Sequence, residues 1–204
     1  MRRCQLLAIL LAVGAGGCFP SFGDLTGGNQ PNDAARDSAL EPVDQMGPCA
    51  TNADCVAPSV CQLGACGGLV GNYYASENLS GENVIRIDSS IDFNWGYGSP
   101  APGIMTDRFS VRWTGWVTPL YSEMYTFYTT SDDGVVLWVD DVTVVDHWTP
   151  HQATEDMGSI TLTAGVTHSL KLEYHDTINE AVIKLAWSST SQPKEIVPTG
   201  RLTP

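Results

Sequence analysis

The sequence predicts an all-β fold, an antiparallel β-sandwich or barrel, for residues 67–204. Short runs rich in Val, Ile, Tyr, Phe, Trp and Thr alternate there with turns of Gly, Asp, Asn, Ser and Pro, which is typical of sandwiches and barrels. Apolar and polar residues alternate within several runs, which gives each strand one buried and one hydrated face. No segment of useful length has the 3.6-residue period of a helix.

The alternation is clearest in residues 106–117. Phe109, Val111 and Trp113 share one face of that predicted strand, and polar residues share the other. The same period recurs in three further runs, at residues 125–129, 170–175 and 183–187.

Two local features predict tight backbone geometry in this region. Asp140 and Asp141 lie between two apolar runs, as residues of a short β-hairpin turn do. Gly115 interrupts a predicted strand, which indicates either a bulge or a place where a side chain would clash with the facing sheet.

The first residues of the chain predict export. Arg2 and Arg3 form a short basic region, residues 6–13 form an apolar run, and small residues 14–17 follow. This order is typical of a secretory signal peptide, here residues 1–17, and the apolar run is too short to span a bilayer as a mature helix. A buried N-terminal helix is the alternative.

The residues that end at Cys18 resemble a bacterial lipobox. The resemblance implies cleavage before Cys18, acylation of that cysteine, and attachment of the mature protein to a bacterial membrane through a lipid anchor only, at the outer membrane or cell surface. Ala15 departs from the pattern, which usually has Leu at this position. A plain signal peptide with an incidental cysteine is therefore the alternative.

The chain is strongly acidic. Its formal net charge is −13, and residues 1–17 contain two Arg and no acid, so their removal changes the charge from −13 to −15. Such a chain is a poor partner for nucleic-acid phosphates and anionic lipid surfaces, and it attracts cations. We expect no nucleic-acid partner.

Residues 18–48 predict a lipidated, disordered tether. They are rich in Gly, Pro, Asn and Asp, lack a sustained helical or strand period, and contain few large apolar residues. This composition cannot bury enough apolar surface to fold alone.

Residues 49–66 predict a small segment held by disulfides. Its four cysteines are Cys49, Cys55, Cys61 and Cys66. An even number of cysteines in a short stretch of an exported chain argues for two disulfides, and three pairings are open. We favour the interleaved pairing, in which the first cysteine bonds the third. A Cys₄ zinc site is the alternative, although the usual paired spacing is missing.

Seven phrases in the predicted β-region together resemble the protective-antigen fourteen-kilodalton (PA14) domain family. The resemblance covers residues 68–199 and implies a β-sandwich. The phrases occur in the family's order at residues 68–74, 109–115, 125–127, 131–140, 162–165, 172–174 and 184–187.

The tetrapeptide Ser131–Gly134 is the most informative short motif. It contains Asp132 and Asp133, whose adjacent carboxylates repel each other unless a cation or hydrogen-bond donors compensate them. Calcium prefers carboxylate and carbonyl oxygens supplied by loops. The alternative is a turn, with Gly134 supplying a positive φ and the Asp side chains capping the backbone.

The family resemblance makes the calcium interpretation more specific. In carbohydrate-binding members a paired Asp, joined by a cis peptide bond, holds a calcium ion that contacts sugar hydroxyls. Those positions correspond to Asp132 and Asp133, and the remaining ligands come from a loop that corresponds to residues 175–180, with Asp176 and Asn179. The resemblance thus implies a calcium cofactor and a glycan or other cell-surface polymer as partner.

His147 and Trp148 are candidate ligand-binding residues beside this site. The Trp148 ring could stack on a sugar face, although a core or rim position is equally expected of it. His147 and His151 are four residues apart, but no helix is predicted that would place them on one face. The sequence therefore does not favour a metal pair at these histidines.

The sequence gives little support for catalysis. Neither a G-x-S-x-G nor an H-E-x-x-H motif occurs. Asp132 and Asp133 are sequence neighbours, whereas the two carboxylates of a glycosidase are separated by a cleft. We expect a binding module that is not an enzyme, with a structural or protein-interaction module as the alternative.

Overall fold

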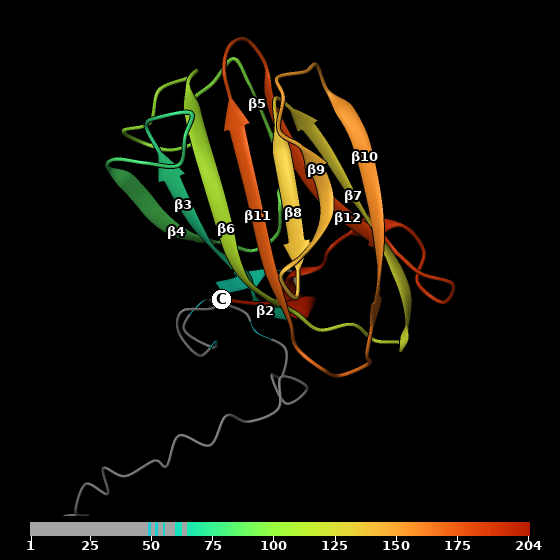
Figure 1. The fold of residues 1–204 in the computed structure, drawn as a ribbon. Helices are drawn as coiled ribbons and strands as arrows, with labels where there is room; N and C mark the ends of the chain where they lie inside the picture. Colours follow the sequence, from blue (N-terminus) through green and yellow to red (C-terminus); the bar gives the residue numbers. More distant parts are fainter. Residues whose placement is uncertain (1–48, 50–51, 53–54, 56–59, 63–64) are drawn as a thin grey trace, which may run out of the picture. The chain divides into compact units, whose positions relative to one another are not determined.

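The computed structural model describes Cys49, Asn52, Cys55, residues 60–62 and residues 65–204 (Figure 1). The predicted signal peptide, Cys18 and the tether lie outside these residues. Within the described residues the regular elements are strands, apart from short 3₁₀ turns such as η3 (Thr199–Arg201). No helix in this part of the chain is long and apolar enough to span a membrane.

The strands form two antiparallel sheets and a short hairpin (Figure 1). In spatial order the large sheet contains β4 (Asn83–Asp88), β3 (Leu69–Tyr74), β6 (Phe109–Val117), β11 (His168–Asp176), β8 (Val135–Val139) and β9 (Val142–His147), and β14 (Leu202–Thr203) also pairs with β6. The small sheet contains β10 (Thr154–Leu162), β7 (Glu123–Asp132), β12 (Ala181–Ser188) and β13 (Glu195–Ile196), and β5 (Asp92–Gly96) also pairs with β12. The hairpin consists of β1 (Val60–Gln62) and β2 (Ala65–Gly67). The predicted all-β sandwich is confirmed.

The core lies between the two sheets, and the predicted alternation defines it. Phe109, Val111 and Trp113 of β6 are fully buried, as the sequence pattern predicts. In the small sheet, Phe127 of β7 and Trp187 of β12 are buried in the same way and their rings contact each other, with centroids 6.1 Å apart. These strands, β6, β7 and β12, therefore present their apolar faces to the opposite sheet.

The hairpin prediction is confirmed, and the prediction for Gly115 needs a correction. Asp140 and Asp141 have φ angles of 49° and 61° and join β8 to β9, as a tight hairpin turn requires. A Cβ on Gly115 would lie 2.4 Å from the Thr203 carbonyl oxygen. The close neighbour is therefore β14 in the same sheet, and not the facing sheet as predicted.

The cysteine-rich segment contains the two predicted disulfides. Cys49 is bonded to Cys61, with Cα atoms 5.8 Å apart, and Cys55 to Cys66, with Cα atoms 5.4 Å apart. This is the interleaved pairing that the sequence analysis favours. Because all four sulfur atoms are used in disulfides, they are not available as thiolate ligands for zinc.

A buried polar network around Asp88, which the sequence analysis did not identify, joins β3, β4 and β6. Oδ2 of Asp88 accepts hydrogen bonds from the Tyr73 hydroxyl at 2.6 Å and the Trp113 indole nitrogen at 2.7 Å. Oδ1 accepts from Nε of Arg86 at 2.6 Å. A Cβ on Gly71 would lie 2.6 Å from Oδ2, so this position is restricted to glycine.

We predict that Asp88→Ala destabilises the fold much more than Asp88→Asn. Alanine leaves the Tyr73 hydroxyl and the Trp113 N–H without this acceptor and Arg86 without its counter-charge, at a cost of about 3–5 kcal/mol in the free energy of unfolding. Asparagine keeps one acceptor and should cost about 1–3 kcal/mol. Urea unfolding followed by tryptophan fluorescence measures both values, and equal losses in the two variants would contradict the role of this network.

Candidate functional site

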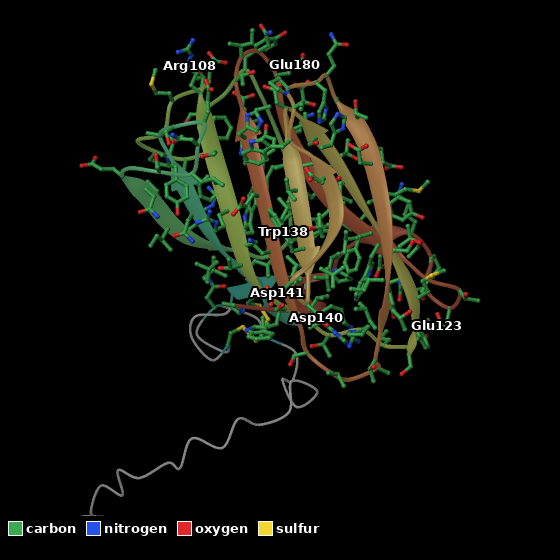
Figure 2. All side chains as sticks on the ribbon, in the orientation of Figure 1. Arg108, Glu123, Trp138, Asp140, Asp141 and Glu180 are labelled. Carbon is green, nitrogen blue, oxygen red and sulfur yellow. A yellow bond between two sulfur atoms is a disulfide. The ribbon has the colours of Figure 1, made fainter. Side chains whose placement is uncertain are left out.

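Four connections gather at one end of the sandwich. They are residues 105–108 before β6, 133–134 between β7 and β8, 148–153 between β9 and β10, and 177–180 between β11 and β12. Antiparallel pairing brings them together, because Asp176 pairs with Phe109 and Ser131 pairs with Thr154. Figure 2 shows Arg108 and Glu180 at this end, and Asp140 and Asp141 at the opposite end.

The Asp132–Asp133 pair anchors two of these connections. Its peptide bond is cis, as the family resemblance implies. Oδ2 of Asp132 accepts the Ala153 backbone N–H at 3.1 Å, and Oδ1 of Asp133 accepts the His151 backbone N–H at 3.2 Å. Oδ2 of Asp133 accepts both the backbone N–H of Thr177, at 2.7 Å, and its hydroxyl. The pair thus fixes the 148–153 and 177–180 connections relative to each other.

Asp176 is the most unusual residue of this end. Its side chain is fully buried, and neither carboxyl oxygen has a hydrogen-bond partner among the residues that the structure describes. Burial, and then the charges of Asp133, Asp107 and Asp132 in that order, together raise the pKa of Asp176 to about 7. A buried carboxylate without a donor or a counter-charge is strongly unfavourable. The arrangement therefore lacks a positive partner for this group.

Asp107 belongs to the site, and the sequence analysis missed it. It lies two residues before β6, and its Oδ1 accepts the backbone N–H of Asn179 at 3.1 Å. Asn179 has a φ of 80°, a left-handed conformation that asparagine tolerates better than most residues. The sequence shows an acidic residue just before Phe109, where the predicted alternation begins. The pairing of this strand with β11, which brings Asp107 to the site, could not be predicted from the sequence.

Asp132 has a raised pKa as well. Burial is the main cause, and the neighbouring charge of Asp133 adds to it. Carboxylates that are held together in this way disfavour ionisation of one another, and a divalent cation removes the repulsion.

These residues fit a calcium ion in their chemistry. Asp132, Asp133 and Asp176 offer carboxylate oxygens, Asn179 offers its side-chain oxygen, and calcium takes oxygen ligands from irregular loops. The unpartnered oxygens of Asp176 are the observation that supports the fit. Both carboxylate oxygens of Asp133 already accept hydrogen bonds from the protein. To bind an ion, the carboxylate must either turn away from Thr177 or use one oxygen both for the ion and for a hydrogen bond.

Trp148 and His175 form one side of this end. The Trp148 ring is half-buried and lies 4.5 Å, centroid to centroid, from the His175 ring. Nε2 of His175 lies 2.8 Å from the Trp148 carbonyl oxygen, which can only accept, so this nitrogen carries a hydrogen. His175 therefore holds the backbone of Trp148 beside the aspartates.

The structure places His147 in a different cluster from the aspartates. Its Nδ1 lies 2.7 Å from Oδ2 of Asp156, and its ring stacks on that of His151 with centroids 3.8 Å apart. No helix is needed for this contact, because the 148–153 connection brings His147 and His151 together.

The comparisons with known proteins agree with this fold. The model of the PA14 domain family matches residues 67–201. The anti-sigma-I factor RsgI3 of Acetivibrio thermocellus is 50% identical over 137 residues, which are 67% of this chain and 21% of that protein. This chain thus spans only about a fifth of that relative's length.

Two solved structures are similar to the same region. An anti-sigma factor domain-containing protein superposes with a TM-score of 0.66 and 50% identity, over 67% of this chain and 47% of that one. The PA14 sugar-binding domain from an RTX adhesin gives a TM-score of 0.54 at 20% identity, over 67% of this chain and 98% of that one. With the family match over residues 67–201, the chain belongs to the PA14 domain family.

Proposed function

We propose that this protein is a cell-envelope binding module that recognises a glycan through calcium. Asp132, Asp133, Asp176 and Asn179 hold the ion, and Trp148 borders the surface that receives the sugar. The observation that carries the proposal is the buried, unpartnered carboxyl group of Asp176 among other acids.

The coordination number of calcium leaves room for a sugar at this site. Calcium takes six to eight oxygen ligands at about 2.3–2.6 Å, which is more than these four residues supply. The remaining positions are open to water or to paired hydroxyl groups of a sugar. A neutral sugar suits a strongly acidic protein, because it carries no charge for the net −13 to repel.

Trp148 supplies the apolar contact that sugar recognition requires. One face of a sugar ring carries C–H groups, and these pack on aromatic faces. His175 holds Trp148 next to the aspartates in two ways: its ring contacts the Trp148 ring, and its Nε2 donates a hydrogen bond to the Trp148 carbonyl oxygen. The similar domain from the RTX adhesin, which is described as sugar-binding, supports a ligand of this class.

A structural or protein-interaction role without calcium is the second candidate. The observation in its favour is that Asp133 already accepts three hydrogen bonds, from Thr177 and His151, and so orders both connections without an ion. This role leaves Asp176 without an explanation.

We predict that calcium raises the melting temperature by several degrees. Binding to the native state alone contributes about 2.7 kcal/mol at a hundredfold excess over Kd, and magnesium should act much less because it requires regular octahedral geometry. The double variant Asp132→Asn, Asp133→Asn should lose the shift. The matched control is Asp140→Asn, Asp141→Asn, which makes the same charge change at the opposite end and should keep it.

A glycan array with and without chelator tests the sugar. Binding should require calcium, disappear in the Asp132, Asp133 double variant and weaken at least tenfold in Trp148→Ala. A calcium shift without glycan binding would reject the sugar and keep the ion, whereas no shift in wild type would reject both and favour the structural role.

We predict an unusual pH dependence of stability in calcium-free protein. The folded pKa of Asp176, about 7, lies above the unfolded value of about 3.9, so the folded state binds more protons between these pH values. Stability should therefore fall, by on the order of a few kcal/mol, as the pH rises from about 4 to about 7.

Urea unfolding at several pH values measures this dependence. Asp176→Asn should flatten it, and Asp146→Asn, an exposed control on β9, should not. Saturating calcium should also flatten it, because the ion favours the ionised carboxylate. Stability that rises with pH in calcium-free wild type would contradict the assignment.

We also propose that the protein is anchored to a bacterial membrane by lipid on Cys18. Intact-mass measurement of membrane-extracted protein should give a chain that begins at acylated Cys18, and Cys18→Ser should release the protein from the membrane fraction. An unmodified Cys18, or a mature chain that begins elsewhere, would reject the anchor.

A further inference from the structure

A second group of potential metal ligands lies where the edges of the two sheets meet. His147 ends β9, the edge strand of the large sheet, and Asp156 lies on β10, the edge strand of the small sheet. His151 comes from the connection between them. One donor atom from each of the three residues lies within 4.8 Å of the others.

The two edge strands are in direct contact beside this group. A Cβ on Gly158 of β10 would lie 1.8 Å from the Val144 carbonyl oxygen of β9, so the backbones approach as closely as glycine allows. The positions of His147 and Asp156 are therefore fixed by the sheets and do not depend on a mobile loop.

The hydrogen bond of His151 reveals which ring nitrogen is free to bind a metal. Nδ1 lies 2.9 Å from the Gln152 carbonyl oxygen, which can only accept, so Nδ1 carries the hydrogen. In the neutral ring the lone pair is then on Nε2, and this atom is buried with no hydrogen-bond partner in the described part of the chain. A ring that donates one N–H to a backbone carbonyl and presents the other nitrogen is the usual state of a metal-binding histidine.

The other two donors are already oriented toward each other. Nδ1 of His147 and Oδ2 of Asp156 are 2.7 Å apart, and a proton currently joins them. The rings of His147 and His151 stack at 3.8 Å with an interplanar angle of 24°. Both rings must turn before their lone pairs converge on one ion, because a metal lies close to the plane of each imidazole that binds it and these two planes are nearly parallel.

We propose that His147, His151 and Asp156 bind one divalent transition-metal ion of the zinc, nickel or copper class. Two imidazole nitrogens and one carboxylate oxygen are ligands that these ions prefer, whereas calcium selects oxygen alone. Three protein ligands leave a fourth position for water or an external ligand. This site is separate from the proposed calcium site and does not depend on it.

The metal would also order the connection that frames the aspartates. The backbone N–H of His151 binds Asp133, and that of Ala153 binds Asp132, so both contacts lie on the same six-residue connection. An ion that joins β9, the 148–153 connection and β10 would hold in place the side of the candidate calcium site that this connection forms.

The test is a zinc titration of untagged, disulfide-bonded protein by calorimetry, with cobalt(II) absorption as a second readout. Wild type should bind one equivalent of zinc, and cobalt should give visible bands of nitrogen and oxygen coordination without a thiolate charge-transfer band. His147→Ala, His151→Ala and Asp156→Asn should each raise the Kd at least tenfold.

Matched variants separate this site from the other acids. Asp146→Asn makes the same charge change as Asp156→Asn next to His147 on the exposed face and should bind zinc like wild type. Asp176→Asn, which changes the calcium site at a side chain without a hydrogen bond to the 148–153 connection, should also retain zinc, so a failed calcium site leaves this result unaffected. No stoichiometric zinc binding by wild type, or equal affinities in Asp156→Asn and Asp146→Asn, would overturn the proposal.

Discussion

The burial of Asp176 without a hydrogen-bond partner is the constraint around which this end of the molecule is organised. The residue ends the central strand β11, whose pairing with β6 and β8 is fixed by the core, so its carboxyl group cannot reach solvent. The nearby acids raise its pKa and do not compensate its charge. A proton removes the charge, and a divalent cation would compensate the ionised carboxylate.

The two proposed metal sites share a wall but differ in chemistry. The aspartates and Asn179 offer only oxygen, whereas His147, His151 and Asp156 offer nitrogen and one carboxylate, so different ions are selected. The 148–153 connection contributes backbone N–H groups to the first site and a ring to the second. Because the sheets fix both ends of this connection, occupation of one site restricts the conformations available to the other.

Alternation along the strands was sufficient to predict the sheets and the buried face of β6, because a period of two is a local property of the sequence. The Asp132–Asp133 pair was visible for the same reason, as adjacent residues. Asp107 and Asp88 were missed because their roles depend on strand pairing, which joins residues far apart in sequence. A metal pair at His147 and His151 was not favoured because no helix was predicted there, although a short connection between edge strands brings the two rings together.

Proton release on calcium binding tests most directly the claim that Asp176 is a calcium ligand. One titration detects both the bound ion and the carboxyl group with the raised pKa. Calorimetric titrations near pH 6.5, in two buffers with different ionisation enthalpies, give the number of protons released per ion. With a pKa of about 7, Asp176 is largely protonated there and must ionise to become a ligand. The account predicts release of roughly half a proton or more per calcium in wild type and much less in Asp176→Asn. Calcium binding without proton release, or no binding, would contradict it.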